Sequence, residues 1–123
     1  MNIESVKTLF TLFSGEDVSE KYTPLITLSV SEVEKMLLPD ADPSDVRLDF
    51  LCAAVANHRL QQINSARERA EFTVAGKMLT VSQNTSLAYS EKLLRDYMNL
   101  CSELIKQKTF VFMSFADTPE DDL

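Results

Sequence analysis

Apolar residues recur at helical spacing over most of the chain. Ile3, Val6, Phe10 and Phe13 follow one another at intervals of three or four residues, which places them on one face of a helix. Gly15 comes directly after this stripe and suits the left-handed backbone that ends many helices. The first segment is therefore predicted to be an amphipathic helix.

The second segment repeats the pattern, with one ambiguity at its start. Pro24 is accommodated either in the first turn of a helix that begins at Thr23, or as a bend in a helix that begins near Asp17. Leu38-Pro39 ends the helix in both cases. The apolar stripe of this predicted helix consists of Tyr22, Ile26, Val30, Val33 and Leu37.

The third helix is predicted to be the central one. Asp42 and Pro43 offer a capping carboxylate and a proline at the first helical position. From Leu48 to Ala56 the sequence is apolar on nearly every helical face, and a helix of this kind must be surrounded by others. After Asn57 the sequence becomes polar, and the helix is expected to end near Ala66.

A β-hairpin is predicted next, over residues 71–82. Gly76-Lys77 fits a two-residue turn of type II′, which takes glycine at its first central position. In this register Phe72 lies opposite Val81 and Val74 lies opposite Leu79, so the apolar side chains share one face. A two-stranded hairpin is marginal alone and needs support. Either its apolar face packs on helices of the same chain, or its edge joins a neighbouring subunit.

A long last helix and a short extended segment complete the predicted fold. The helix begins near Thr85 or Ser86 and ends near Lys106, and residues 110–115 form the extended segment. The tail, residues 117–123, is acidic and is expected to be disordered because it has little to bury. The sequence thus predicts a mainly α single domain over residues 1–116, a bundle of about four helices with one β-hairpin inserted before the last long helix.

The charge balance and the hydropathy pattern disfavour two classes of partner. The chain has 12 basic and 19 acidic residues among 123, for a net charge of −7. A protein that grips DNA or RNA by its phosphates needs the opposite balance or a strong basic patch, so we expect no sequence-specific nucleic acid binding. No run of about 20 apolar residues occurs, so we expect no membrane association. The first residues lack the basic start and apolar stretch of a signal peptide, which favours a cytoplasmic location.

Residues with metal-binding or catalytic potential are few and scattered. Cys52 and Cys101 each lie in an apolar helical pattern, which is typical of free buried cysteines. His58 is the only histidine, and neither a zinc-binding pattern nor a nucleophile motif accompanies it. The acidic stretch 40–45 resembles a calcium loop but lacks the glycine and the glutamate that such a loop requires. We expect no catalytic residue, no metal, no cofactor and no enzymatic activity.

The remaining candidate function is contact with other proteins. Three phenylalanines crowd into residues 110–115 beside the acidic tail, and the predicted hairpin carries a compact apolar face. The candidate subunit or partner interface consists of Phe72, Val74, Gly76, Lys77, Leu79, Val81, Phe110, Phe112 and Phe115.

Several short segments carry a family resemblance: Leu9-Phe10, Gly15-Glu16, the apolar stripe of the second helix, Asp40-Ala41-Asp42 through Arg47-Leu48, Ala53-Ala54-Val55-Ala56-Asn57, Ala75-Gly76-Lys77 and Phe110-Val111-Phe112. With these segments, the predicted order of helix, helix, capped central helix, hairpin and long helix resembles the head–tail connector (head-completion) proteins of tailed bacteriophages and prophages. The resemblance covers nearly the whole chain. It implies a structural virion component that forms a homo-oligomeric ring under the portal and lets DNA pass to the tail. Portal and tail-side phage proteins would be its partners, and it would be in the bacterial cytoplasm during assembly and in the virion afterwards.

Two other functions compete with the connector. The main alternative is a cytoplasmic helical adaptor or chaperone-like module that binds one partner helix in a groove between its own helices. A small enzyme with a pair of carboxylates comes third, because any fold can bring two carboxylates together. Nothing in the sequence nominates such a pair.

Overall fold

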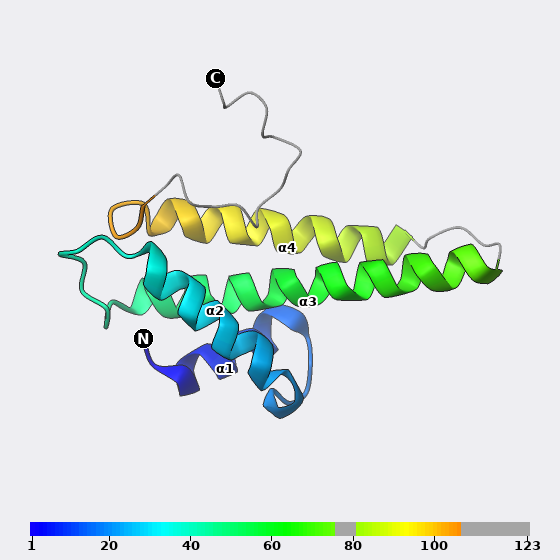
Figure 1. Cartoon of the computed structure of the whole chain (residues 1–123), viewed down its shortest axis with the longest axis horizontal. Helices are drawn as coiled ribbons and strands as arrows, with labels where there is room; N and C mark the ends of the chain where they lie inside the picture. The colour runs from blue at the N-terminus through cyan, green and yellow to red at the C-terminus, as the bar shows by residue number, and fades with distance from the viewer. Residues whose placement is uncertain (76–80, 107–123) are drawn as a thin grey trace, which may run out of the picture.

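The described part of the protein is mainly helical. The computed structural model describes residues 1–75 and 81–106, and within them the side chains of residues 1–70 and 85–106. These residues form four α-helices and one short 3-10 turn: α1 (Ile3–Ser14), η1 (Glu20–Tyr22), α2 (Thr23–Met36), α3 (Val46–Ala75) and α4 (Val81–Leu100) (Figure 1). These four helices confirm the mainly α class and the number of helices predicted from the sequence. No described helix could span a membrane, because none combines sufficient length with sufficient apolar character.

The ends of α1 follow from local side-chain chemistry. The Asn2 side chain accepts hydrogen bonds from the backbone nitrogens of Glu4 and Ser5, at 3.0 and 3.2 Å, and so caps the first turn. Gly15 closes the helix with a positive φ of 79° and donates its N–H to the carbonyl of Thr11. This backbone conformation favours glycine and turns the chain away from the axis of α1.

The starts of α2 and α3 refine the sequence predictions. Helix α2 begins at Thr23 with Pro24 in its first turn, directly after the 3-10 turn, so Pro24 starts the helix rather than bending it. Helix α3 begins at Val46, later than predicted. The carboxylate of Asp45, not that of Asp42, accepts from the backbone nitrogen of a first-turn residue, Arg47, at 3.0 Å. Asp42 instead accepts from the backbone of Ser44, in a turn that precedes the helix.

The predicted hairpin strands are wrong wherever the structure describes them. Phe72 and Val74 lie in α3, which continues to Ala75, and Val81 is the first residue of α4. Extending a helix adds one hydrogen bond per residue without a new nucleation step, whereas a two-stranded hairpin needs a third strand or a supporting surface. The turn residues 76–80, the segment 110–115 and the tail 117–123 lie outside the described residues.

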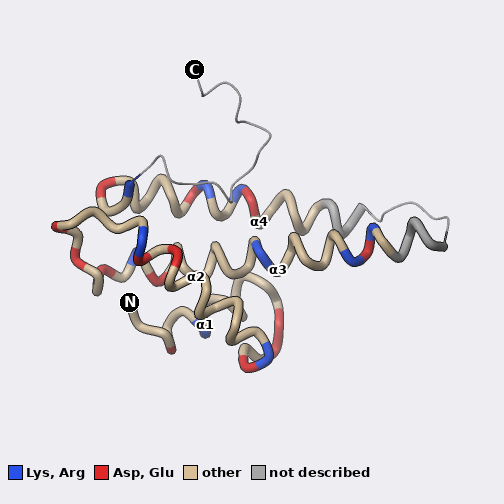
Figure 2. Tube along the Cα trace, viewed as in Figure 1, with Lys and Arg blue, Asp and Glu red and all other residues tan. Residues whose placement is uncertain are grey.

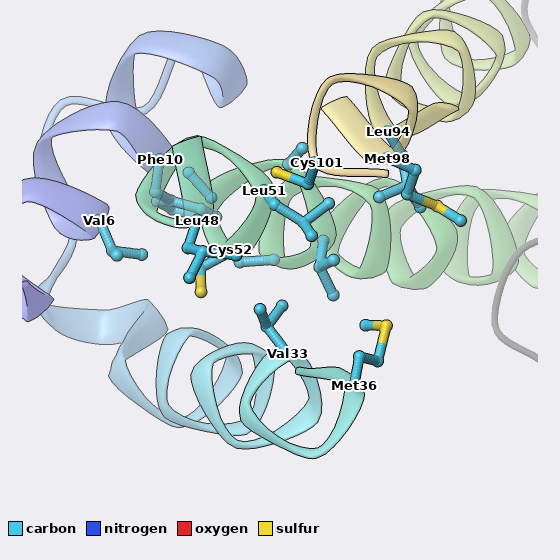
Figure 3. Packing of buried hydrophobic residues seen from close by; sticks show 14 of the residues in the cluster. Val6, Phe10, Val33, Met36, Leu48, Leu51, Cys52, Leu94, Met98 and Cys101 are labelled. Atoms are coloured by element: carbon cyan, nitrogen blue, oxygen red, sulfur yellow. The ribbon is translucent and has the colours of Figure 1, made fainter. Parts of the chain in front are cut away.

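Helix α3 is the centre of the molecule, as its apolar sequence predicts. Residues 51–56 are completely buried, because α1, α2 and α4 surround this part of the helix. Figure 3 shows side chains from these three helices converging on Leu48, Leu51 and Cys52 of α3. The surrounding core residues include Val6 and Phe10 of α1, Ile26, Val33 and Met36 of α2, and Leu94 and Met98 of α4.

The chain returns to the start of α3 after α4. Leu37 and Ile105 form an antiparallel bridge, in which the backbone nitrogen of Leu38 donates to Leu104 at 3.0 Å and that of Lys106 donates to Met36 at 2.8 Å. Helix α4 ends at Leu100 rather than near Lys106. This bridge fastens the segment after α4 to the end of α2.

Helices α3 and α4 form an antiparallel pair that extends past the rest of the molecule (Figure 1). At 1.5 Å per residue, the 30 residues of α3 span about 45 Å. Helices α1 and α2 pack on its first half, and the buried apolar core stops at Leu60 on α3 and at Leu94 on α4. We call the part beyond these residues, 61–75 of α3 and 81–93 of α4, the arm.

Candidate functional site

The residues predicted to form an interface fall at the arm or outside the described residues. Phe72 and Val74 lie on the backbone of α3 near the end of the arm, and Val81 begins α4 there. The structure therefore brings these three positions to one end of the molecule, on helices rather than strands. The other candidates lie outside the described residues: Gly76, Lys77, Leu79, Phe110, Phe112 and Phe115.

Where the apolar core stops, α3 and α4 are joined by polar side chains. His58 and Ser90 are 3% and 2% exposed, and Nδ1 of His58 lies 2.9 Å from Oγ of Ser90. The Ser90 hydroxyl donates to the carbonyl of Leu87 at 2.8 Å. The same hydroxyl pairs with Nδ1 of His58, which donates to its oxygen in one ring tautomer and accepts its proton in the other.

The surroundings of this histidine–serine pair favour an uncharged imidazole ring. Burial lowers the pKa of His58 below its ordinary value of 6.5, Glu91 opposes this shift, and Arg59 adds to it. The ring is therefore neutral near pH 7. The pair links the two helices.

A pocket opens beside this contact between His58 of α3 and Ser90 of α4. Its volume is about 160 Å³, and it lies between the end of α1 and the facing sides of α3 and α4. We call it the α1-end pocket. Its lining residues carry no formal charge: Phe13, Ser14, Asn57, Gln61, Ser86, Tyr89, Ser90 and Leu93.

Two amide side chains form the polar wall of the α1-end pocket. Asn57 and Gln61 are only 4% and 9% exposed, and Nε2 of Gln61 donates to Oδ1 of Asn57 at 3.1 Å. One turn further along α3, the buried hydroxyl of Ser65 has no hydrogen-bond partner in the described part of the chain. A buried polar group without a partner lowers the stability of the fold. We therefore expect the part of the arm around Ser65 to be less stable than the apolar core.

The pocket exists because α1 ends where it does. The ring of Phe13 stacks on Tyr97 of α4 at 5.6 Å and lies 6.4 Å from Phe50 of α3, so the last turn of α1 covers the groove between these helices. Gly15 then turns the chain away. The α1-end pocket is the uncovered continuation of the same groove.

Sequence reasoning missed this site, although a signal is present. Asn57 and Gln61 are four residues apart on α3, and Ser86 and Ser90 are four apart on α4, so each pair shares a helix face. The polar residues after Asn57 predict only that the helix ends near Ala66. In the structure, Asn57, His58 and Gln61 are buried between α3 and α4 instead.

Ion pairs hold the helices together elsewhere. Arg59 of α3 makes a two-point contact with Glu32 of α2, at 3.2 and 2.6 Å. Arg47 contacts Asp45 at 2.9 Å and Glu103 at 2.8 Å, and it lowers the pKa of Asp45 to about 2. Figure 2 shows Lys and Arg interspersed with Asp and Glu along the described helices rather than gathered into one basic strip. These contacts fasten α3 to α2 and to the segment after α4.

The two cysteines are free and buried, as predicted. Burial raises the pKa of Cys52 to about 12 and that of Cys101 to about 11, so both remain thiols at neutral pH. Among the described residues, no group of three or more His, Cys, Asp or Glu side chains could hold a metal ion.

Comparisons with known proteins place no relative beside this chain: no family model, no curated protein and no solved structure matches it.

Proposed function

We propose that the protein is a non-enzymatic structural subunit, a head–tail connector of a tailed phage or prophage that assembles into a ring under the portal. The resemblance of the sequence to that family supports the proposal over nearly the whole chain. The helical fold is compatible with it, with the hairpin replaced by helix where the structure describes that region. The protein would act in the bacterial cytoplasm during assembly and in the virion afterwards.

The arm is the observation that carries this proposal. It extends past α1 and α2, and its described part contains no buried apolar side chain beyond Leu60 and Leu94. Two large apolar side chains on it are exposed, Ile63 at 42% and Tyr89 at 70%. A projecting pair of helices with a polar joint gains little from apolar burial within its own subunit. Packing against a neighbouring subunit would supply that burial.

A ring also explains why the two ends of α3 differ. Subunits in a closed ring meet through two different surfaces, so one end of each subunit contacts a different part of the next. The arm would be one of these surfaces. The net charge of −7 supports a channel wall along which DNA passes without being gripped.

The decisive experiment is mass spectrometry of purified particles from a phage that encodes the chain, with cross-linking to locate its neighbours. We expect the chain in the particles at a fixed ratio to the portal protein, with cross-links from the arm to a second copy. Absence from the particles would overturn the connector proposal. A cytoplasmic adaptor, the alternative function, would be found bound to one partner outside the virion.

A matched pair of substitutions separates the arm from the rest of the surface. Ile63→Glu places a charge on the arm, and Leu28→Glu places one on α2, where the parent side chain is similarly exposed, at 47% against 42%. Particle incorporation should fall for Ile63→Glu and persist for Leu28→Glu, while both purified proteins keep the helical circular dichroism of the parent. Equal incorporation of the two variants would contradict a role for the arm.

A further inference from the structure

We propose that the α1-end pocket binds a carboxamide, the side chain of an asparagine or glutamine on a partner protein. This site goes beyond ring assembly because it depends on its own hydrogen-bonding groups, although residues of the arm form part of its wall. The pocket has buried polar side chains and uncharged walls, and it opens to solvent.

The hydrogen bonds that the pocket leaves unused define the ligand. The bond between Gln61 and Asn57 uses one oxygen and one nitrogen. The amide nitrogen of Asn57 and the amide oxygen of Gln61 have no other hydrogen bond among the described residues. A free amide nitrogen and a free amide oxygen therefore remain on two residues that line the pocket, and a carboxamide offers the complementary acceptor and donor.

This pairing does not depend on how the two amides are oriented. If both amide groups are turned over, Asn57 donates to Gln61 instead, and the free groups become an oxygen on Asn57 and a nitrogen on Gln61. A donor and an acceptor again remain. A carboxylate ligand would leave the free oxygen without a donor, and an ammonium ligand would leave the free nitrogen without an acceptor.

The other lining residues favour a carboxamide on a protein side chain over that of a free amino acid. Phe13, Tyr89 and Leu93 supply apolar contact for the methylene groups of a side chain, and the pocket has room for a few heavy atoms in its 160 Å³. No lining residue is charged, so the pocket offers nothing to the ammonium and carboxylate groups of a free amino acid. Tyr89, which is 70% exposed, stands at the surface where a partner protein would approach.

The test is a nuclear magnetic resonance titration of the full chain, labelled with nitrogen-15, with N-acetylglutamine methylamide as the probe. We expect saturable shifts of the side-chain amide signals of Asn57 and Gln61, with a dissociation constant on the order of millimolar for so small a ligand. N-acetylglutamate methylamide, which differs only in carrying a carboxylate, should bind at least about tenfold more weakly, or 1.4 kcal/mol. Free glutamine should also bind more weakly than the capped amide.

Variants locate the binding on the protein. Gln61→Leu should abolish saturation, while Gln62→Leu, the next position on the same helix, should retain it. Ser86→Phe fills the pocket from an exposed position, so it tests the site even if Gln61→Leu does not fold. Shifts that do not saturate, equal shifts with the carboxylate probe, or binding retained in Ser86→Phe would each overturn the proposal and leave a hydrated pocket only. Each of these results is independent of whether the protein forms a ring.

Discussion

Ser90→Ala is the sharpest test of the polar contact that links His58 of α3 to Ser90 of α4. In the parent protein the Ser90 hydroxyl lies 2.9 Å from Nδ1 of His58, and both side chains are almost fully buried. Alanine removes the hydroxyl and leaves Nδ1 of the buried imidazole without a partner. The carbonyl of Leu87 loses a donor as well, but this carbonyl can keep the ordinary backbone bond of its helix.

The magnitude follows from which group is left unpaired. A typical hydrogen bond contributes about 0.5–1.5 kcal/mol, but a buried donor or acceptor left without a partner costs about 1–3 kcal/mol. We therefore expect Ser90→Ala to lower the free energy of unfolding by about 1–3 kcal/mol. His58→Leu should cost less, because the Ser90 hydroxyl keeps its bond to Leu87. The double variant should recover most of the loss caused by Ser90→Ala, because both polar groups are gone.

Urea denaturation followed by far-ultraviolet circular dichroism measures these differences. The midpoint should move while the slope of the transition stays constant, since a constant slope shows that the same surface is exposed on unfolding. A loss below about 0.5 kcal/mol for Ser90→Ala, which is within the range of ordinary surface substitutions, would refute the reasoning. So would a larger loss for His58→Leu than for Ser90→Ala.

Three further predictions concern pH, an ion pair and the core. Burial lowers the pKa of His58 in the folded state. The contribution of His58 to the free energy of unfolding is therefore fully present above pH 6.5, and it is lost as the pH drops from 6.5 through the lower pKa of the folded state. His58→Leu should remove this fall in denaturation curves recorded between about pH 7 and about pH 5, and identical pH profiles would contradict it. A double-mutant cycle of Glu32→Gln and Arg59→Met should give a coupling of about 0.3–1 kcal/mol that weakens at high salt, and a coupling of zero would count against the pair. Leu94→Ala should cost about 2–5 kcal/mol, whereas Leu100→Ala, on a side chain that is 48% exposed, should cost little; equal losses would be inconsistent with the core.

Much of the fold is predictable from local sequence because local forces decide it. The stripe of Val6 and Phe10 predicts the buried face of α1, and Gly15 predicts its end at a positive φ. The all-round apolar stretch of α3 predicts its central place, because such a helix has no face that can meet water. Each of these inferences needs only helical periodicity or the steric freedom of one residue.

The hairpin prediction failed because β structure depends on more than its own residues. The sequence around Gly76 satisfies the rules for a turn and a register, yet Phe72 and Val74 continue α3. Helix α3 is already formed by its packed first half, so adding turns to it requires no distant partner. A hairpin at that place would need a supporting surface, and the turn rules do not report whether one exists.

By itself, the sequence determined the helical class, the central helix and the polar spacing of Asn57 with Gln61. Spacing of this kind shows that two side chains share a helix face, but not what that face meets. Only the tertiary structure decided that this face is buried beside α4, and that Gly15 ends α1 early enough to leave a pocket there. The physical reason is that burial and pocket shape arise from contacts between helices far apart in the chain, which no local pattern encodes.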